Sequence, residues 1–357
     1  MKLTNIFFFA FFVLIGMACS KDDGDPRVGT GEAAVLSIST RSVGILPTKA
    51  GDVNELPGEA NINNLAVLVF DETGTELLGE PAWATTEVKD GVASILDVPC
   101  KSLKAQIVII ANVPQGTFSD VTNMSGLQSR IVQLAAQSQS NLTMSSQVIV
   151  TENALKKGDN YLGYASMGAD NINGISKPVE VTRLVARVEL AQVSTRFDGT
   201  KLDGCTLRLD NVHIQNRKTA SHYFSASYWG AVETAGYLDN SSVVAIGRTV
   251  TDNSPLSPSY VTYVMENESA SEASTALVVT ATLLTPTGTA AQTKNFTAII
   301  NDNGLEKGYN HNNVKRNFVY RLKLTFGENS FDPVTADLIV EVEVLDWGPV
   351  YQDVVVE

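Results

Sequence analysis

FVYRLKLTF (residues 318–326) and LIVEVEVL (residues 338–345) are the stretches that decide the fold class of this chain. In both, an apolar side chain stands at every second position, and the positions between them include charged residues such as Arg321 and Glu341. A period of two places successive side chains on opposite faces of a β-strand. Each stretch therefore predicts a strand with one face toward a core. The alternating apolar positions are Phe318, Tyr320, Leu322, Leu324, Phe326, Leu338, Val340, Val342 and Val344.

Strand signals of this kind cover much of the remaining chain. Residues 65–70 (LAVLVF) and 105–111 (AQIVIIA) are continuous apolar runs, which are typical of strands buried on both faces. Residues 285–288 (TPTG) separate two strand signals and predict a hairpin. The other predicted strands are 34–40, 92–98, 148–150, 179–194, 206–215, 276–284, 294–300 and 350–356.

One segment has helical spacing instead. Leu127, Ile131 and Leu134 repeat at i, i+4 and i+7, so we expect a short amphipathic helix over residues 125–137. Many short strands and few helices predict an all-β fold made of β-sandwiches. The length of 357 residues is enough for two such domains. Because glycine, asparagine and proline interrupt the pattern over 157–178, we place the domain boundary between residues 178 and 179.

Residues 216–272 have little periodicity and are rich in Ser, Asn, Tyr and Ala. They predict long surface loops with short strands. Tyr223, Tyr228 and Trp229 could form a ligand surface in these loops. The simpler interpretation is that the loops have no binding role.

The N-terminus has the pattern of an export signal. Lys2 is followed by an apolar run from Ile6 to Gly16, which is too short to span a bilayer as a mature helix. Residues 1–18 are therefore a predicted signal peptide. Ala18 precedes Cys19, as in a bacterial lipobox, and we expect Cys19 to be lipidated. Gly16 stands where lipoboxes usually carry Leu, so an ordinary signal peptide with an incidental Cys19 is the alternative.

Composition excludes some classes of partner. The formal net charge is −13, and loss of residues 1–18 removes only Lys2, which gives −14. Such an acidic chain repels phosphate backbones, so no nucleic-acid partner is expected. After Cys19 there is no apolar run long enough for a membrane span. Cys100 and Cys205 are the two other cysteines and are expected to be separate buried thiols, although export would permit a disulfide.

No pattern of catalytic or metal-binding residues is present. His213, His222 and His311 lie outside ligand spacing of one another and of cysteine, and no nucleophile elbow, phosphate loop or dinucleotide fingerprint occurs. Glu341 and Glu343 share a strand face, which is more simply a solvated face than a glycosidase pair. We therefore predict no catalytic residues, no cofactor and no metal, and a protein that is not an enzyme.

Several segments, in this order and spacing, resemble the FimA-like fimbrillins, the type V pilins of the Bacteroidales. The resemblance extends over nearly the whole chain, although each segment is weak alone. The segments are the lipobox with its tether and the strand 37–41 (SISTR), then 65–71 (LAVLVFD), 107–112 (IVIIAN), 161–164 (YLGY) with 183–187 (RLVAR), and finally 316–320 (RNFVY), 322–325 (LKLT) and 346–347 (DW).

The resemblance implies two transthyretin-like β-sandwich domains and a maturation route. The precursor would reach the outer membrane as a lipoprotein, and a trypsin-like, arginine-specific protease would cut after an N-terminal arginine. By position this is Arg41, which would make Ser42 the new N-terminus and residues 19–41 a lipidated propeptide with a removable strand. Arg27 is the competing site, but a cut there would leave the strand 34–40 in place.

Loss of the strand 34–40 would leave a groove with an unpaired strand edge, which is a template for another strand. The C-terminal segment 349–357, with Val350, Val354 and Val356, is the predicted donor strand. The alternative is that this segment pairs within its own domain. The functional hypothesis is a structural subunit of a cell-surface fimbrium that supports adhesion, with identical or related subunits as partners and a host or bacterial receptor possible. A tip or accessory fimbrillin, or a non-polymerising surface lipoprotein, is the alternative.

Overall fold

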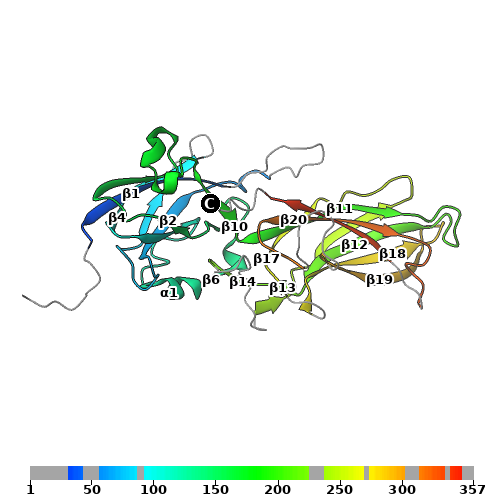
Figure 1. Ribbon diagram of the computed structural model, residues 1–357. Coiled ribbons are helices and arrows are strands. Elements are labelled where there is room, and N and C mark those ends of the chain that lie inside the picture. Colours follow the sequence, from blue (N-terminus) through cyan, green and yellow to red (C-terminus); the bar gives the residue numbers. More distant parts are fainter. Residues whose placement is uncertain are drawn as a thin grey trace, which may run out of the picture. The chain divides into compact units, whose positions relative to one another are not determined.

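The computed structural model describes residues 31–42, 56–86, 92–224, 237–268, 273–301, 313–333 and 338–347. Within these ranges nearly all regular structure is β-strand (Figure 1), which confirms the predicted all-β fold. None of the helices in these ranges is long and apolar enough to cross a membrane. The helical segments are α1 (Met124–Gln128), η1 (Leu134–Ala136), η2 (Ala165–Asp170) and η3 (Ile172–Gly174).

The strands follow the alternation of the sequence closely. Residues 206–215, 276–284 and 318–326 form strands with the predicted bounds. The first ten strands are β1 (Ala33–Ser42), β2 (Asn64–Asp71), β3 (Ala82–Thr85), β4 (Val92–Lys101), β5 (Ala105–Ala111), β6 (Ile131–Gln133), β7 (Met144–Ser145), β8 (Ile149–Val150), β9 (Gly158–Leu162) and β10 (Val179–Arg183). The others are β11 (Val185–Thr195), β12 (Thr206–Gln215), β13 (Arg217–Lys218), β14 (Ala220–His222), β15 (Leu238–Asp239), β16 (Val244–Val250), β17 (Tyr260–Met265), β18 (Ala276–Leu284), β19 (Ala290–Ile299), β20 (Phe318–Phe326) and β21 (Leu338–Asp346).

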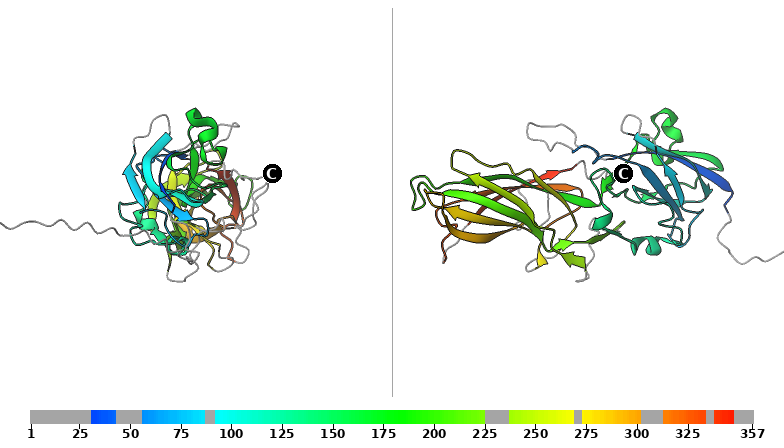
Figure 2. Two further views of the ribbon diagram at one scale, coloured as in Figure 1. Left: turned by 60° about the vertical axis from the view of Figure 1, so that its left-hand side comes forward. Right: turned by 180° about the vertical axis from the view of Figure 1, so that it is seen from behind.

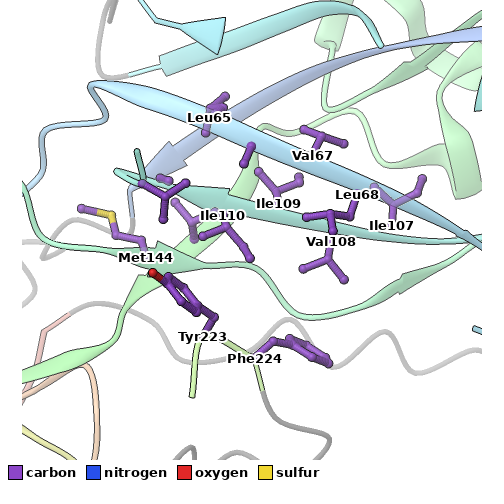
Figure 3. Packing of buried hydrophobic residues seen from close by; sticks show 14 of the residues in the cluster. Leu65, Val67, Leu68, Ile107, Val108, Ile109, Ile110, Met144, Tyr223 and Phe224 are labelled. Carbon is purple, nitrogen blue, oxygen red and sulfur yellow. The ribbon is translucent and has the colours of Figure 1, made fainter. Parts of the chain in front are cut away.

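Nine strands from the first half of the chain form one sheet. Its order is β3-β2-β5-β7-β10-β1-β4, with β8 paired to β5 and β9 paired to β1. The sheet folds over on itself, because β4 also contacts β2 and β3 without sharing a ladder with either. The inner side chains of β1, β2, β4 and β5 pack into one hydrophobic core. Figure 3 shows the part of this core around Leu65, Val67 and Ile109.

The second half contains two four-stranded sheets, β17-β11-β20-β21 and β16-β12-β18-β19. Their facing side chains form a second hydrophobic core, to which Val188, Leu209, Leu277 and Leu322 contribute. The predicted hairpin at 285–288 joins β18 to β19. The core residues lie on the alternating apolar faces that the sequence predicts, as β20 illustrates with Tyr320 and Leu322 fully buried.

Only the first turn of the helix predicted over 125–137 is present. Helix α1 ends at Gln128, and Ile131–Gln133 instead form β6, which pairs with β14. Ile131 and Val132 are β-branched and favour a strand, and the edge of β14 offers them ladder hydrogen bonds. A helix of so few residues has little stability of its own to oppose this.

Two other predictions need correction. The single strand predicted over 179–194 is interrupted at Leu184, so that β10 stays in the nine-stranded sheet and β11 joins a sheet of the second half. Tyr223 is not part of a ligand surface, since it is buried in the first core with its ring edge-on to Phe118 at 5.2 Å between centroids. Figure 3 shows Tyr223 and Phe224 on the side of β5 toward which Val108 points. Tyr228 and Trp229 lie outside the described residues.

The cysteines behave as two separate thiols. Cys100 is buried, Cys205 is half-buried, and neither forms a disulfide. His213 lies in β12 as a half-buried strand residue, and His311 lies outside the described residues. Glu343 forms an ion pair with Arg321 (3.6 Å) and Glu341 is exposed, as expected of a solvated strand face.

Candidate maturation strand and assembly site

Strand β1 (AAVLSISTRS) is held by its alternating side chains. Leu36 and Ile38 are fully buried in the first core, together with the smaller Ala34. On the opposite face, Ser37 and Ser39 are also nearly inaccessible although they are small and polar. The strand therefore fills a narrow space in the sheet, and it does so with few large side chains. The view from behind (Figure 2, right) shows β1 as the blue strand along this sheet.

Both edges of β1 are paired. It runs antiparallel to β4 along nearly its whole length, and parallel first to β9 and then to β10. Among the described residues, β4 and β9 have no other strand partner in the sheet. Removal of β1 would thus open two facing strand edges at once, and open edges with unpaired N–H and C=O groups accept another strand.

The chain closes tightly against β1 at Gly163. This residue has φ +87, and a Cβ atom built on it would lie 2.5 Å from the carbonyl oxygen of Ser39. Only glycine combines that backbone conformation with so close an approach. Gly163 therefore sets the fit of the segment after β9 against β1.

The predicted cleavage site, Arg41 and Ser42, forms the C-terminal end of β1. The Arg41 guanidinium is largely exposed and pairs with the Glu180 carboxylate of β10 at 2.5 Å. Next to it, the buried Thr40 hydroxyl donates a hydrogen bond to the Val179 carbonyl oxygen (2.7 Å). A cut after Arg41 would separate the whole of β1 from the chain that follows, apart from Ser42 itself.

Cys100 lies directly opposite Ala34 at the other end of β1. Both side chains belong to the first core. Burial raises the pKa of the Cys100 thiol to about 11, so the thiol is poorly reactive while β1 is in place. The reactivity of the Cys100 thiol therefore reports whether β1 is present.

The described residues end at Trp347, which lies in a buried cluster of charged and aromatic groups. The guanidinium groups of Arg183 and Arg187 lie 4.6 and 5.2 Å from the centre of its ring, and the ring of Tyr263 stacks parallel to it at 6.0 Å. Arg187 pairs with the fully buried Glu59 carboxylate (2.5 Å), which also accepts a hydrogen bond from Tyr263 (2.6 Å). Burial, followed by this carboxylate, raises the pKa of the Tyr263 hydroxyl.

This cluster fixes three parts of the chain to one another. Arg183 is the last residue of β10, and the first residues of β10 pair with β1. The Arg183 Nε donates a hydrogen bond to the Glu59 carbonyl oxygen (3.0 Å). Buried ion pairs of this kind are costly to break by removal of one partner. Sequence reasoning did not find this cluster. Arg183 and Arg187 are two positions of a predicted strand, and no local signal marks them as buried.

The structure brings some of the sequence-predicted residues together and leaves others out. Arg41 and Ser42 lie side by side at the end of β1, next to β10. Cys19, the competing Arg27, and the donor residues Val350, Val354 and Val356 lie outside the described residues. Among the described residues no group of His, Cys, Asp and Glu could hold a metal ion.

Comparison with known proteins now adds to this geometry. Residues 34–183 match the family model of the major fimbrial subunit protein FimA, and residues 184–347 match that of the C-terminal domain of Fim1C-like fimbrium tip subunits. A protein of Parabacteroides distasonis with the provisional name fimbrium tip subunit Fim1C is 45% identical over 377 residues, which cover 99% of each chain.

Solved structures agree. A crystal structure from Parabacteroides distasonis, described provisionally as a cell adhesion protein, is 44% identical, covers 91% of this chain and 100% of its own, and has a TM-score of 0.80. A fimbrilin (FimA) from Porphyromonas gingivalis has the same fold at 20% identity, with coverage of 91% and 100% and a TM-score of 0.61. The fold is thus that of a fimbrial subunit with β-sandwich domains. The chain belongs to the fimbrillin family, and it is a subunit of cell-surface fimbriae.

Proposed function

We propose that this fimbrial subunit is made as a lipoprotein precursor and matures by the loss of β1. Residues 1–18 act as the signal peptide, the lipid on Cys19 holds the precursor at the outer membrane, and an arginine-specific protease cuts after Arg41. The mature chain then begins at Ser42 with two domains, 42–183 and 184–357, because β10 (Val179–Arg183) belongs to the nine-stranded sheet rather than to the second domain predicted from residue 179. It joins identical or related subunits by strand exchange, and a host or bacterial receptor is a further proposed partner.

The observation that carries this proposal is the position of β1 in its sheet. Its two flanking strands, β4 and β9, have no other strand partner among the described residues, and the predicted cut lies at its very end. A strand that fills a slot and can be cut free at one end is suited to replacement by a strand from a second subunit.

For a subunit that lies within the filament, the proposed donor is the C-terminal segment 349–357. Burial of Val350, Val354 and Val356 at roughly 1.5–2 kcal/mol each would contribute on the order of 5 kcal/mol, with ladder hydrogen bonds in addition. Ordering a free tail opposes this by about 1–2 kcal/mol per residue. Further end-to-end contacts between subunits are therefore part of the proposal. Such a head-to-tail contact does not close on itself and extends into a filament.

Within the fimbrium, the comparisons favour the tip position over the stalk. The 45% identical relative and the family model that matches residues 184–347 both carry the description of a tip subunit. A subunit at the free end of a filament needs only one neighbour. We propose that the groove of β1 makes this contact, so that the tail 349–357 is dispensable for incorporation at the tip.

Two substitutions of one residue test the maturation step. Arg41→Ala and Arg41→Lys both remove the site of an arginine-specific protease, while Lys keeps the positive charge beside Glu180. Both variants should stay at precursor size on the cell and be absent from isolated fimbriae. Incorporation of either variant at the wild-type level would contradict the assignment of Arg41.

Deletion of residues 349–357 separates tip from stalk. For a tip subunit, the shortened chain should still enter fimbriae in normal amounts. Loss of polymers that ladder on unboiled gels would instead identify a stalk subunit that donates its tail. A chain that keeps its lipidated Cys19 and never enters fimbriae would be a non-polymerising surface lipoprotein.

A further inference from the structure

The two residues that flank the Arg41–Ser42 bond are paired with neighbouring strands, Arg41 on both sides and Ser42 on one. Arg41 lies opposite Glu180 of β10 and opposite Val92 of β4, and Ser42 lies opposite Val181 of β10. A protease binds its substrate as an extended strand along a free backbone edge. In the folded precursor, neither edge of Arg41 is free.

The side chains on either side of Arg41 are less accessible than Arg41 itself. Thr40, which precedes Arg41, is fully buried and hydrogen-bonded to Val179, and the Ser42 hydroxyl oxygen is buried. The Arg41 side chain is 45% exposed and is paired with Glu180, and Ser42 is half-buried. A protease could thus contact the arginine side chain without binding the backbone of the residues on either side of it.

Building on the function proposed above, we propose that the Arg41–Ser42 bond is latent in the folded precursor and that Glu180 sets how often it becomes available. Cleavage requires the last residues of β1 to separate from β10 and β4. Water then adds across the peptide bond, leaving a carboxylate on Arg41 and an amine on Ser42. The observed rate is the intrinsic rate multiplied by the small fraction of molecules in the open state.

Glu180 is well placed for this control because it lies on β10, far from the substrate segment in sequence. A change at Glu180 cannot alter the residues that the protease reads. It changes only the pairing that holds the end of β1, where the exposed Arg41–Glu180 pair contributes modestly and Thr40 adds a hydrogen bond.

The test compares cleavage of the full-length precursor with cleavage of a peptide of residues 37–48, using one arginine-specific endopeptidase. The bond in the precursor should be cut at least about 30-fold more slowly than in the peptide, since the end of a paired strand is open in only a small percentage of molecules. Urea below the unfolding transition should accelerate cleavage of the precursor but not of the peptide. This second measurement does not depend on any variant folding correctly.

Variants at Glu180 give the sharper result. Glu180→Gln should accelerate precursor cleavage by about two- to fivefold, and Glu180→Lys by about tenfold, because it places a like charge beside Arg41. Glu72→Gln is the matched control, since it removes another exposed ion pair, to Lys104 at 3.3 Å, next to the end of β2, a strand that does not pair with β1. It should leave the rate unchanged.

Failure of this inference differs from failure of the proposed function. Equal rates for precursor and peptide would overturn latency, and equal rates for wild type and both Glu180 variants would overturn the role of Glu180. Either result would leave Arg41 as the cleavage site. A peptide that is not cut at Arg41, or a fimbrial chain that begins at Val28, would contradict the proposed function itself.

Discussion

Strands β1 and β20 occupy equivalent places in their sheets but are held very differently. Each has a parallel neighbour on one side, β9 and β10 for β1 and β11 for β20, and an antiparallel edge strand on the other, β4 and β21 respectively. The inner face of β20 carries five large side chains, all nearly inaccessible, whereas that of β1 has two large ones, Leu36 and Ile38.

The polar contacts differ in the same direction. At the middle of β20, Arg321 bridges Glu189 at 2.9 Å and Glu343 at 3.6 Å on the two neighbouring strands. In β1 the ion pair, between Arg41 and Glu180, lies at the C-terminal end of the strand. Since each fully buried large apolar side chain contributes about 1.5–3 kcal/mol, β20 is the better retained strand. Under the proposed function, one pairing geometry serves as a permanent element in the second half of the chain and as a replaceable one in the first.

A covalent lock on β1 should have the largest effect. Ala34→Cys places a thiol directly opposite the native Cys100, within the reach of a cross-strand disulfide. The oxidised variant should still be cut after Arg41, but β1 should stay attached, and incorporation into fimbriae should be abolished until a reductant is added.

The matched control for the lock is Ala33→Cys, whose side chain lies on the opposite face of β1 and is exposed. It should assemble normally with or without reductant. Wild-type incorporation of the oxidised Ala34→Cys protein, with its disulfide verified by mass spectrometry, would show that β1 need not leave.

Leucine-to-alanine substitutions in the two strands should separate precursor from mature subunit. Leu36 and Leu322 are both fully buried, so each truncation should lower the free energy of unfolding of the precursor by about 2–5 kcal/mol. In assembled subunits only Leu322→Ala should still destabilise, because β1 is absent there. Urea unfolding of both forms measures this, and an equal loss from Leu36→Ala in assembled subunits would argue that β1 is retained.

Thiol labelling of Cys100 should report the loss of β1. At pH 8 a pKa of about 11 leaves roughly 0.1% of this thiol as thiolate, whereas a thiol with an ordinary pKa of 9.0 is roughly 10% thiolate. Labelling should therefore be about 100-fold faster after β1 leaves, with the difference shrinking as the pH approaches 11. Cys205, in the second half of the chain, should label at the same rate in both forms.

The smallest effect is expected from loosening the fit against β1. Gly163→Ala forces a Cβ atom against the Ser39 carbonyl oxygen and adds the strain of a positive φ, together about 1–3 kcal/mol. Gly158→Ala has similar strain at φ +82 but no atom within 4 Å of the added Cβ. Cleavage after Arg41 should accelerate more in Gly163→Ala than in Gly158→Ala. Equal rates would mean that this contact does not hold β1.

The contrast between the two halves of the chain also explains how much of the fold could be predicted from the sequence. The strands of the second half agree with the prediction to within a residue where alternation is strict, as in 318–326, because pattern and burial coincide there. The helix predicted over 125–137 is wrong because Leu127, Ile131 and Leu134 have helical spacing, while the edge of β14 offers Ile131 a strand partner that only the tertiary fold supplies.

The site was predictable in part. The strand 34–40 and its terminal arginine could be found from the sequence, but its neighbours could not, since β9 and β10 are joined to it by long-range parallel pairing. The buried charges were also beyond local reasoning. Arg187 is stabilised by Glu59, 128 residues away, and no short-range pattern distinguishes such an arginine from one on a solvated face.

The intact mass of subunits released from purified fimbriae tests the central claim most directly. We predict a chain that begins at Ser42, with no peptide ending at Arg41 bound to it under native conditions. A chain that still carries the lipid on Cys19, or a cleaved chain that retains the β1 peptide in its sheet, would contradict the account.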